Sequence, residues 1–192
     1  MAPPGGEVYD ISVLFVDVRG FTALAERLPP AEVAQRLNRF YMLASEAIFK
    51  YDGTLDKLVG DQVMAFFGAP LHAKDHPRRA VRVALRILGG MNRLDGEHLH
   101  LGAGIASGAA FVGNVGGGVF TDYTVLGDTV NVAARLQGAA ASGEILVTDE
   151  TYAHVASQYP NAPSRELELK GKSGLVRARV IRINDIAHGQ NP

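Results

Sequence analysis

Residues 8–22 read VYDISVLFVDVRGFT, and this stretch decides how the fold begins. Residues 8–16 are apolar and rich in β-branched side chains, which predicts a buried strand that ends at Asp17. The Arg19-Gly20-Phe21-Thr22 segment then predicts a turn into a helix, with Thr22 as its N-cap. A carboxylate therefore stands where a buried strand gives way to a helix.

Further along the chain, strands and helices alternate. A short helix is broken at Pro29-Pro30, and a longer one is predicted over 31–51, where apolar residues recur at helical spacing. Apolar runs at 54–59 and 62–67, joined by Gly60-Asp61, predict a hairpin. Asp75-His76-Pro77 opens a third helix, and 99–106 and 110–115 predict another pair of strands. The order predicts an α+β fold: a ferredoxin-like βαββαβ core whose helices cover one face of a mainly antiparallel sheet.

Additional αβ elements are predicted after this core. They are a helix over 129–140, a short strand at 145–147, and a closing hairpin of 166–169 with 176–183. We expect one domain over residues 8–185, with a loose lead-in at 1–7 and a tail at 186–192. The lead-in lacks the charged-then-apolar pattern of a signal peptide.

The composition excludes several functional classes. With a net charge of −1 there is no general electrostatic case for binding nucleic acid or an anionic membrane. The absence of cysteine excludes disulfides and thiolate chemistry and suits a reducing cytoplasm, where we expect the chain to work. Residues 101–121 carry no charge, yet the glycines that interrupt them disfavour a membrane-spanning helix.

Two aspartates predict a cation site. Asp17 ends the first strand and Asp61 lies in the hairpin, and these places are neighbours in a βαββαβ core. Paired carboxylates suit hard cations such as Mg²⁺ or Mn²⁺. The Gly20-Phe21-Thr22 segment enters a helix, so its free backbone N–H groups could hold phosphate oxygens. The alternative is that each aspartate only forms a turn.

Three further residues could contact an anionic substrate. Asn131 and Arg135 lie four apart on one face of a predicted helix, and an arginine fork suits a phosphoryl group. Lys57 stands in a largely apolar strand, where lysine is unexpected and suggests a base or phosphate partner. The alternative for the helix pair is an exposed surface.

Other polar residues are predicted to be structural. Lys170 and Lys172 form a small basic turn of a kind that is normally just solvated. His72 and His76 have a metal-like spacing without a third ligand, so we expect them at the surface. The glycine run at 113–118 lacks the ending of a phosphate-binding loop and predicts a hairpin tip.

Three segments together resemble the class III adenylyl cyclase family. FVDVRGFT (15–22) is similar to its first metal motif, KLVGD (57–61) to its second, and YTVLGDTVNVAAR (123–135) to its transition-state segment. They occur in the family's order, and the resemblance runs over nearly the whole chain.

This resemblance implies a site for the metals and the base. Asp17 and Asp61 would hold two divalent ions, Mg²⁺ or Mn²⁺, with the Val18 carbonyl as an extra ligand. Lys57 and Thr124 would read the purine. The implied reaction is the conversion of ATP into cyclic AMP and pyrophosphate, by attack of the ribose 3′-hydroxyl on the α-phosphate.

The resemblance also assigns the phosphate and ribose contacts. Asn131 would position the ribose, Arg135 would stabilise charge on the α-phosphate, and Lys170 would contact the triphosphate. A head-to-tail homodimer is implied, in which one protomer supplies the aspartates and the other supplies the remaining side chains. Regulatory domains outside this chain are compatible with this pattern.

Two departures and two alternatives accompany the resemblance. Thr124 replaces the aspartate of many relatives and is similar to a subgroup often linked to bicarbonate stimulation. Ala109 stands where some relatives have a phosphate-binding arginine.

A guanylyl cyclase is the nearer alternative, but guanine calls for an acceptor at the position of Lys57. The second is a non-catalytic module that binds nucleotide or a partner. A diguanylate cyclase would need a GG(D/E)EF-like hairpin, which residues 59–63 do not supply.

Overall fold

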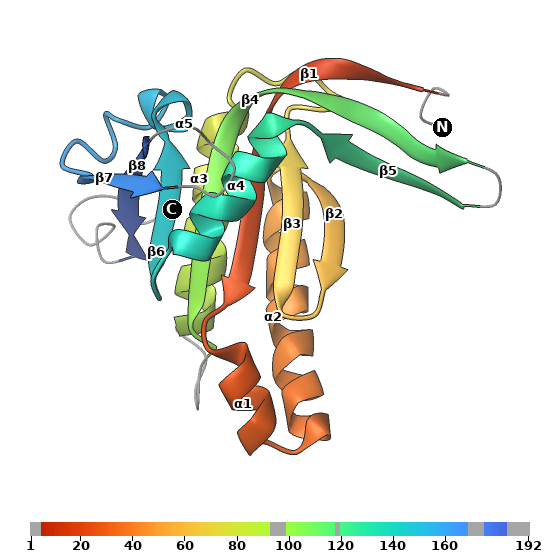
Figure 1. The fold of residues 1–192 in the computed structure, drawn as a ribbon, viewed down its shortest axis with the longest axis vertical. Coiled ribbons are helices and arrows are strands. Elements are labelled where there is room, and N and C mark those ends of the chain that lie inside the picture. Colours follow the sequence, from red (N-terminus) through yellow and green to blue (C-terminus); the bar gives the residue numbers. More distant parts are fainter. Residues whose placement is uncertain (1–4, 93–98, 118–119, 169–174, 184–192) are drawn as a thin grey trace.

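The computed structural model describes residues 5–92, 99–117, 120–168 and 175–183 (Figure 1). The helices and strands alternate along the chain much as predicted. In order they are β1 (Gly6–Val18), α1 (Phe21–Arg27), α2 (Pro30–Lys50), β2 (Thr54–Val59), β3 (Gln62–Phe67), α3 (His76–Asn92), β4 (Leu101–Gly117), β5 (Phe120–Leu126), α4 (Asp128–Ala139), β6 (Glu144–Thr148), α5 (Asp149–Ala153), β7 (Ser164–Glu168) and β8 (Leu175–Arg182).

The strands form a single sheet with β1 near its centre. Their order is β2-β3-β1-β4-β6-β8-β7, and β5 pairs with β4 outside this path. The β4–β6 pair is parallel, and the other pairs are antiparallel. Because β1 has a neighbour on each side and helices over both faces, the residues in its middle, 11–16, are all buried. The predicted α+β class with a mainly antiparallel sheet is confirmed.

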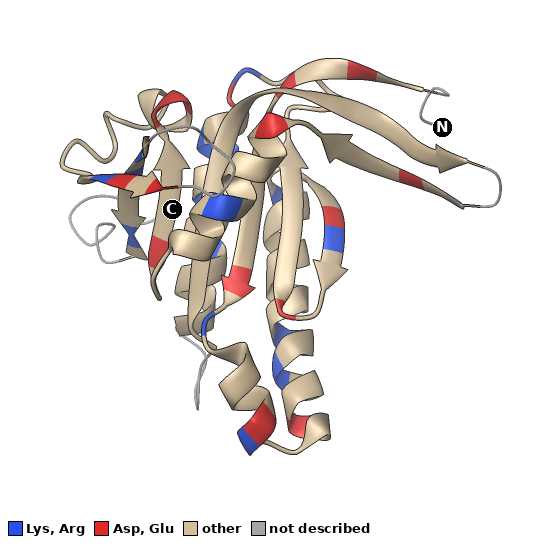
Figure 2. Cartoon of the chain, viewed as in Figure 1, with Lys and Arg blue, Asp and Glu red and all other residues tan. Residues whose placement is uncertain are grey.

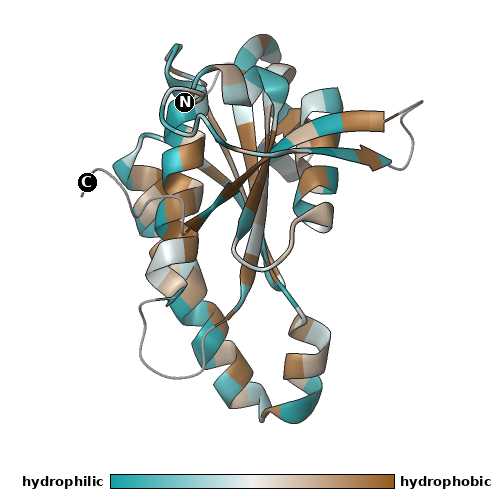
Figure 3. Cartoon of the chain, turned by 90° about the vertical axis from the view of Figure 1, so that its left-hand side faces the viewer, coloured by the Kyte–Doolittle hydropathy of each residue, from teal (hydrophilic) through white to brown (hydrophobic). Residues whose placement is uncertain are grey.

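Helices cover both faces of the sheet, so the prediction that they cover only one face is wrong. Leu14 and Val16 of β1 pack in the core beneath α2 and α3, whereas Val13 and Phe15 pack in a second core with α4. This alternation follows from the two-residue period of a strand. The apolar strands in the middle and the more polar outer helices are visible in Figure 3. Within the described ranges, no helix is both long and apolar enough to cross a membrane.

The predicted division of residues 99–115 into two strands is wrong. β4 runs unbroken through Ser107-Gly108-Ala109, because β1 pairs with it over its own whole length, including Ile11 with Gly108. The hairpin partner of β4 is instead β5, which was not predicted. The two strands pair from Phe111 with Leu126 to Gly117 with Phe120, so the hairpin closes near the end of the glycine run.

Gly104 allows α4 to approach the sheet closely. A Cβ atom added at Gly104 would lie 2.8 Å from the Cα of Gln137, and closer still to backbone atoms of Gln137 and Ala133. These are backbone atoms of the helix, so no rotamer change could make room. This contact sets how α4 lies across β4.

The surface position predicted for His76 is also wrong. Its side chain is buried at the start of α3 and its Nδ1 lies 2.8 Å from the Ser12 hydroxyl. Hydroxyl contacts continue from Ser12 to Ser107 (2.6 Å) and on to Thr151 of α5 (2.8 Å). Burial lowers the pKa of His76, although the Asp10 carboxylate opposes the shift. His72 is exposed as predicted and stacks on Tyr9.

Candidate active site

The end of β1 lies beside the turn of the β2–β3 hairpin (Figure 1), and this brings Asp17 and Asp61 close together. Asp17 pairs in register with Gln62, the residue after Asp61, and the Val18 amide donates to the Asp61 carbonyl at 3.1 Å. Tyr41 of α2 donates its hydroxyl to the carbonyl of Gly60 in the same turn. The predicted proximity of the two aspartates therefore holds, and Val18 lies in the same corner.

The Asp17 carboxylate is unusually easy to protonate. Burial raises its pKa from 3.8 to about 6, with further upward contributions from a hydrogen bond to Asp61 and from the charge of Asp61. Arg19, 3.8 Å away, and Gln137 of α4, which donates from Nε2 at 2.9 Å, oppose this shift. Two like charges face each other here without full compensation, which favours a cation.

The donor set fits divalent metal ions of the hard type. Carboxylate and carbonyl oxygens are the ligands that Mg²⁺ and Mn²⁺ prefer. Among the described residues, no group of three or more His, Cys, Asp or Glu side chains converges on one point, so Asp17 and Asp61 act as a pair. A pair of this kind leaves ligand positions for a substrate that brings oxygens of its own.

The turn after β1 is shaped by Gly20. It has φ of 69°, in the left-handed region, and occupies the N-cap position of α1. Thr22 therefore lies inside the helix rather than at its cap, contrary to the prediction. Phe21 is half-buried against the main core, whereas Thr22 is exposed.

Lys57 and Thr124 are brought together by two strands that do not pair with each other. The Lys57 ammonium on β2 lies 3.4 Å from the Thr124 hydroxyl on β5. Both side chains also contact Asp56, and Lys57 makes a second ion pair with Asp122. These hydrogen bonds raise the pKa of Lys57, that with Asp122 most, so the group carries its positive charge at neutral pH.

Asn131 and Arg135 lie on α4, as predicted. Asn131 is exposed, and Arg135 is partly buried. In the described part of the chain, the Nη1 atom of Arg135 is buried without a hydrogen-bond partner. A buried guanidinium nitrogen of this kind calls for an acceptor.

Ala109 is exposed, and its carbonyl accepts from Thr129 at 2.9 Å. Lys170 falls outside the described residues.

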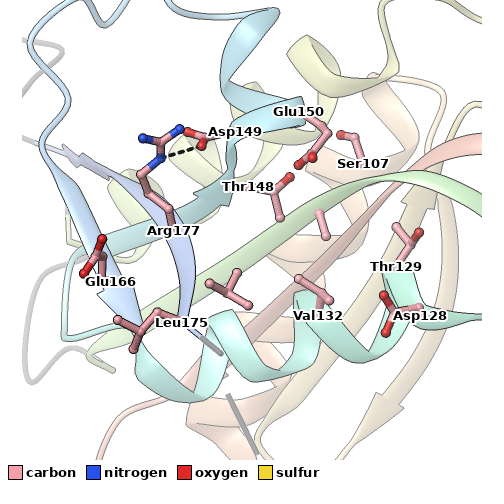
Figure 4. Close-up of a pocket in the computed structure, with 12 residues that line it drawn as sticks. Ser107, Asp128, Thr129, Val132, Thr148, Asp149, Glu150, Glu166, Leu175 and Arg177 are labelled. Carbon is pink, nitrogen blue, oxygen red and sulfur yellow. Dashed lines mark hydrogen bonds and ion pairs between the residues drawn. The ribbon is translucent and has the colours of Figure 1, made fainter. Parts of the chain in front are cut away.

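A separate pocket of about 570 Å³ lies between α4, α5 and the β7–β8 pair (Figure 4). Its lining is rich in carboxylates, and two of the lining residues, Arg177 and Asp149, form an ion pair. The acidic lining residues are Asp128, Asp149, Glu150 and Glu166. So many carboxylates would repel a triphosphate, and this pocket contains none of the predicted site residues.

Four polar residues of these clusters were not predicted: Asp56, Asp122, Arg19 and Gln137. Asp56 directly precedes Lys57, and Arg19 follows Val18, so proximity to the motifs was the available signal. Asp122 and Gln137 meet their partners only in the folded chain, because Asp122 is 65 residues from Lys57 and Gln137 is 120 residues from Asp17. Figure 2 shows how few charges the centre of the sheet carries, which sets these clusters apart.

Comparison with known proteins identifies the family. Residues 6–181 match the family described as adenylate and guanylate cyclase catalytic domain, so this chain belongs to that family. An uncharacterized protein of Mycobacterium tuberculosis (strain ATCC 25618 / H37Rv) is 36% identical over 160 residues, covering 82% of this chain and 30% of that protein. The chain thus spans about a third of the length of such curated relatives.

Solved cyclase structures share the fold closely. The adenylyl cyclase CyaB from P. aeruginosa has a TM-score of 0.80 and 33% identity, over 92% of this chain and 95% of that chain. The guanylyl cyclase Cya2 has a TM-score of 0.84 and 29% identity, over 92% and 93% of the two chains. This chain is therefore a nucleotide cyclase catalytic domain, a family that generally uses divalent metal ions, and its neighbours include both substrate classes.

Proposed function

We propose that this domain is an adenylyl cyclase, which converts ATP into 3′,5′-cyclic AMP and pyrophosphate. The observation that carries the proposal is the pairing of Lys57 with Thr124, 3.4 Å apart, where the family reads its base. Adenine presents an acceptor at N1 and a donor amino group at N6. An ammonium beside a hydroxyl complements both.

The same chemistry disfavours GTP. Guanine presents an N–H at N1 and a carbonyl at C6, so it requires an acceptor opposite N1. Lys57 has only donors, and its charge is reinforced by Asp56 and Asp122. A site that leaves buried polar groups unpaired rejects a substrate strongly. Guanylyl cyclase activity is therefore the second candidate function, after adenylyl cyclase activity.

Asp17, Asp61 and the Val18 carbonyl are the proposed metal ligands. When bound there, two divalent ions would supply the positive charge that favours ionisation of the ribose 3′-hydroxyl and stabilises the leaving pyrophosphate. Burial and the charge of Asp61 raise the pKa of Asp17, and positive charge bound between the two carboxylates would offset both effects. Gln137 donates a hydrogen bond to one Asp17 oxygen, and the Arg19 guanidinium lies 3.8 Å from the same oxygen.

The remaining side chains bind the ribose and the phosphates. The ribose 3′-hydroxyl loses its proton to water, its oxygen forms a bond to the α-phosphorus, and the bond from that phosphorus to the pyrophosphate oxygen breaks. Arg135 is proposed to stabilise the charge on the α-phosphate, which would give its orphaned nitrogen an acceptor. Asn131 orients the ribose, and Lys170 with the Gly20-Phe21-Thr22 turn contacts the triphosphate.

We propose that two copies form head-to-tail shared sites. One copy contributes Asp17 and Asp61, and the other contributes Lys57, Thr124 and the α4 residues. Exposed apolar side chains beside the base-reading pair support this assembly: Val59 is 62% exposed and Leu126 is 50% exposed. Burying them against a second copy would remove apolar surface from water.

Thr124 also supports membership of the threonine-type subgroup. Bicarbonate stimulation is then expected, and a titration of bicarbonate at fixed pH measures it. Unchanged activity across the titration would remove this subgroup property from the proposal. We place the catalytic domain at residues 8–185.

The decisive experiment measures cyclic nucleotide formation by the purified chain from ATP and from GTP, in Mn²⁺ and in Mg²⁺, at several protein concentrations. We expect cyclic AMP from ATP, with specific activity rising as the protein is concentrated. Asp17→Ala should abolish it, and Asp10→Asn, an exposed carboxylate on the same strand, should not. No cyclic product in either metal, from a dimer confirmed by light scattering, would point to a non-catalytic module. Cyclic GMP as the main product would instead identify the domain as a guanylyl cyclase.

A further inference from the structure

Asp56 is a buried carboxylate between the two proposed base-reading side chains. Its side chain is 0% exposed, whereas that of Lys57 is 41% exposed. One Asp56 oxygen accepts from the Lys57 ammonium at 2.8 Å, and the other accepts from the Thr124 hydroxyl at 2.7 Å. A fully buried carboxylate persists in a fold when it is paired in this way.

A bulge in β2 makes this arrangement possible. The pairing of β2 with β3 shifts between Leu55 and Lys57, so Asp56 has no partner of its own in β3. Successive residues of a regular strand point to opposite faces, but a bulge re-aims a side chain. Asp56 and Lys57 can therefore both reach Thr124 on β5.

The hydrogen bonds decide which way the Thr124 hydroxyl points. A carboxylate has no proton to give, so the Thr124 proton is directed at Asp56. The oxygen of Thr124 then offers only lone pairs, one of them toward Lys57. In this state the hydroxyl can accept from an amino group of a base but cannot donate to a carbonyl.

We propose that Asp56 is a specificity-determining positioning residue, which fixes Thr124 as an acceptor and so selects a purine bearing a 6-amino group over one bearing a 6-carbonyl. This inference rests on the proposed function, because it assumes that Lys57 and Thr124 face the base. Asp56 does not touch the base itself. It acts by orienting one proton and holding one ammonium.

The test measures the dissociation constants of 3′-deoxy-ATP and 3′-deoxy-GTP with Mn²⁺. Both lack the attacking hydroxyl, so binding is read without turnover. In Asp56→Asn the side-chain amide can donate a hydrogen bond to the Thr124 oxygen. The hydroxyl proton of Thr124 can then point toward the base. We expect the preference for 3′-deoxy-ATP over 3′-deoxy-GTP to fall by about 10-fold, the size of one charge-assisted hydrogen bond. Asp52→Asn, an exposed aspartate before β2, is the matched control.

A double-mutant cycle separates orientation from general damage. If Asp56 acts through Thr124, then Asp56→Asn should change the preference much less in a Thr124→Val background. Asp56→Glu keeps a carboxylate acceptor, so it should retain the preference for 3′-deoxy-ATP that Asp56→Asn loses. It is the variant to measure if Asp56→Asn fails to fold. An unchanged preference in a folded Asp56→Asn, or an equal change in both backgrounds, would overturn the inference.

The two proposals fail in different ways. A wild-type chain that binds 3′-deoxy-ATP selectively but forms no cyclic AMP would overturn the proposed function and leave the role of Asp56 to be decided by the binding ratios. A chain that makes cyclic AMP while Asp56→Asn keeps the wild-type preference would overturn only the role of Asp56. A wild-type dimer that binds neither nucleotide would overturn both.

Discussion

Lys57 lies between two carboxylates, and this limits what can replace it. Asp56 and Asp122 both hold its ammonium. The site is therefore built around a positive charge at this position. A carboxylate that recognises guanine would be repelled by Asp56 and Asp122 if it replaced Lys57.

Lys57→Glu is expected to abolish activity with ATP without creating activity with GTP. The new carboxylate would stand beside Asp56 and Asp122, and three like charges at contact distance repel one another strongly. Cyclase assays with both nucleotides measure the outcome, and adding Asp122→Asn should partly relieve the repulsion. Efficient cyclic GMP formation by the single variant would contradict this view of the site.

Glu144 is a second carboxylate whose surroundings determine its behaviour. It is buried at the start of β6, where Arg165 binds both of its oxygens at 2.8 and 2.9 Å and Arg182 adds a contact at 3.0 Å. The hydrogen bonds from Arg165 are the largest cause that lowers its pKa from 4.5 to about 2. Folding thus favours the ionised form.

Glu144→Gln is expected to lower the free energy of unfolding by about 2–3 kcal/mol at pH 7. Because the folded pKa lies below the ordinary value, this stabilisation is complete above about pH 4.5 and is lost as the pH falls toward 2. Urea unfolding of both proteins at several pH values measures it. A difference that stays constant down to pH 2 would show that the charge of Glu144 is not its source.

At the level of elements, local patterns predicted more than long-range pairing did. The strand over 8–16, the break at Pro29-Pro30 and the 54–67 hairpin were all predicted, because each is encoded by neighbouring residues. The continuity of β4 was not, since it depends on the length of β1. Asp56 was missed for a similar reason: its burial requires β5, which is far away in the sequence.

The contact between α4 and β4 is tested by two glycine substitutions. Gly104→Ala places a methyl group against helix backbone and should cost several kcal/mol or prevent folding. Gly138→Ala, within α4 and with nothing within 4 Å of the new methyl group, should instead stabilise the protein by about 0.5 kcal/mol. Thermal unfolding measures both. Equal effects of the two substitutions would contradict the close approach at Gly104.

At the level of the whole molecule, the proposed sites need two copies. Within one protomer, Asp17 and Asp61 form one cluster, and Lys57 with Thr124 forms another. The β2–β3 hairpin carries one member of each cluster. In a head-to-tail dimer, therefore, a single hairpin would contribute to two sites.

Mixing Asp17→Ala with Arg135→Ala is expected to restore activity that each variant lacks alone. Random exchange makes half of the dimers mixed, and each mixed dimer has one intact site, so about a quarter of wild-type activity is the upper limit. Cyclic AMP formation before and after mixing measures it. A mixture as inactive as its components, with subunit exchange demonstrated, would place all catalytic residues within one copy.

The close approach at Gly104 also has a consequence for how α4 and β4 move relative to each other. Helix and strand touch backbone to backbone there, without a compressible layer of side chains between them. We therefore expect a displacement of α4 to be accompanied by a displacement of β4. Asn131 and Arg135 lie on this helix, so we expect both side chains to keep their positions relative to β4 when the domain moves.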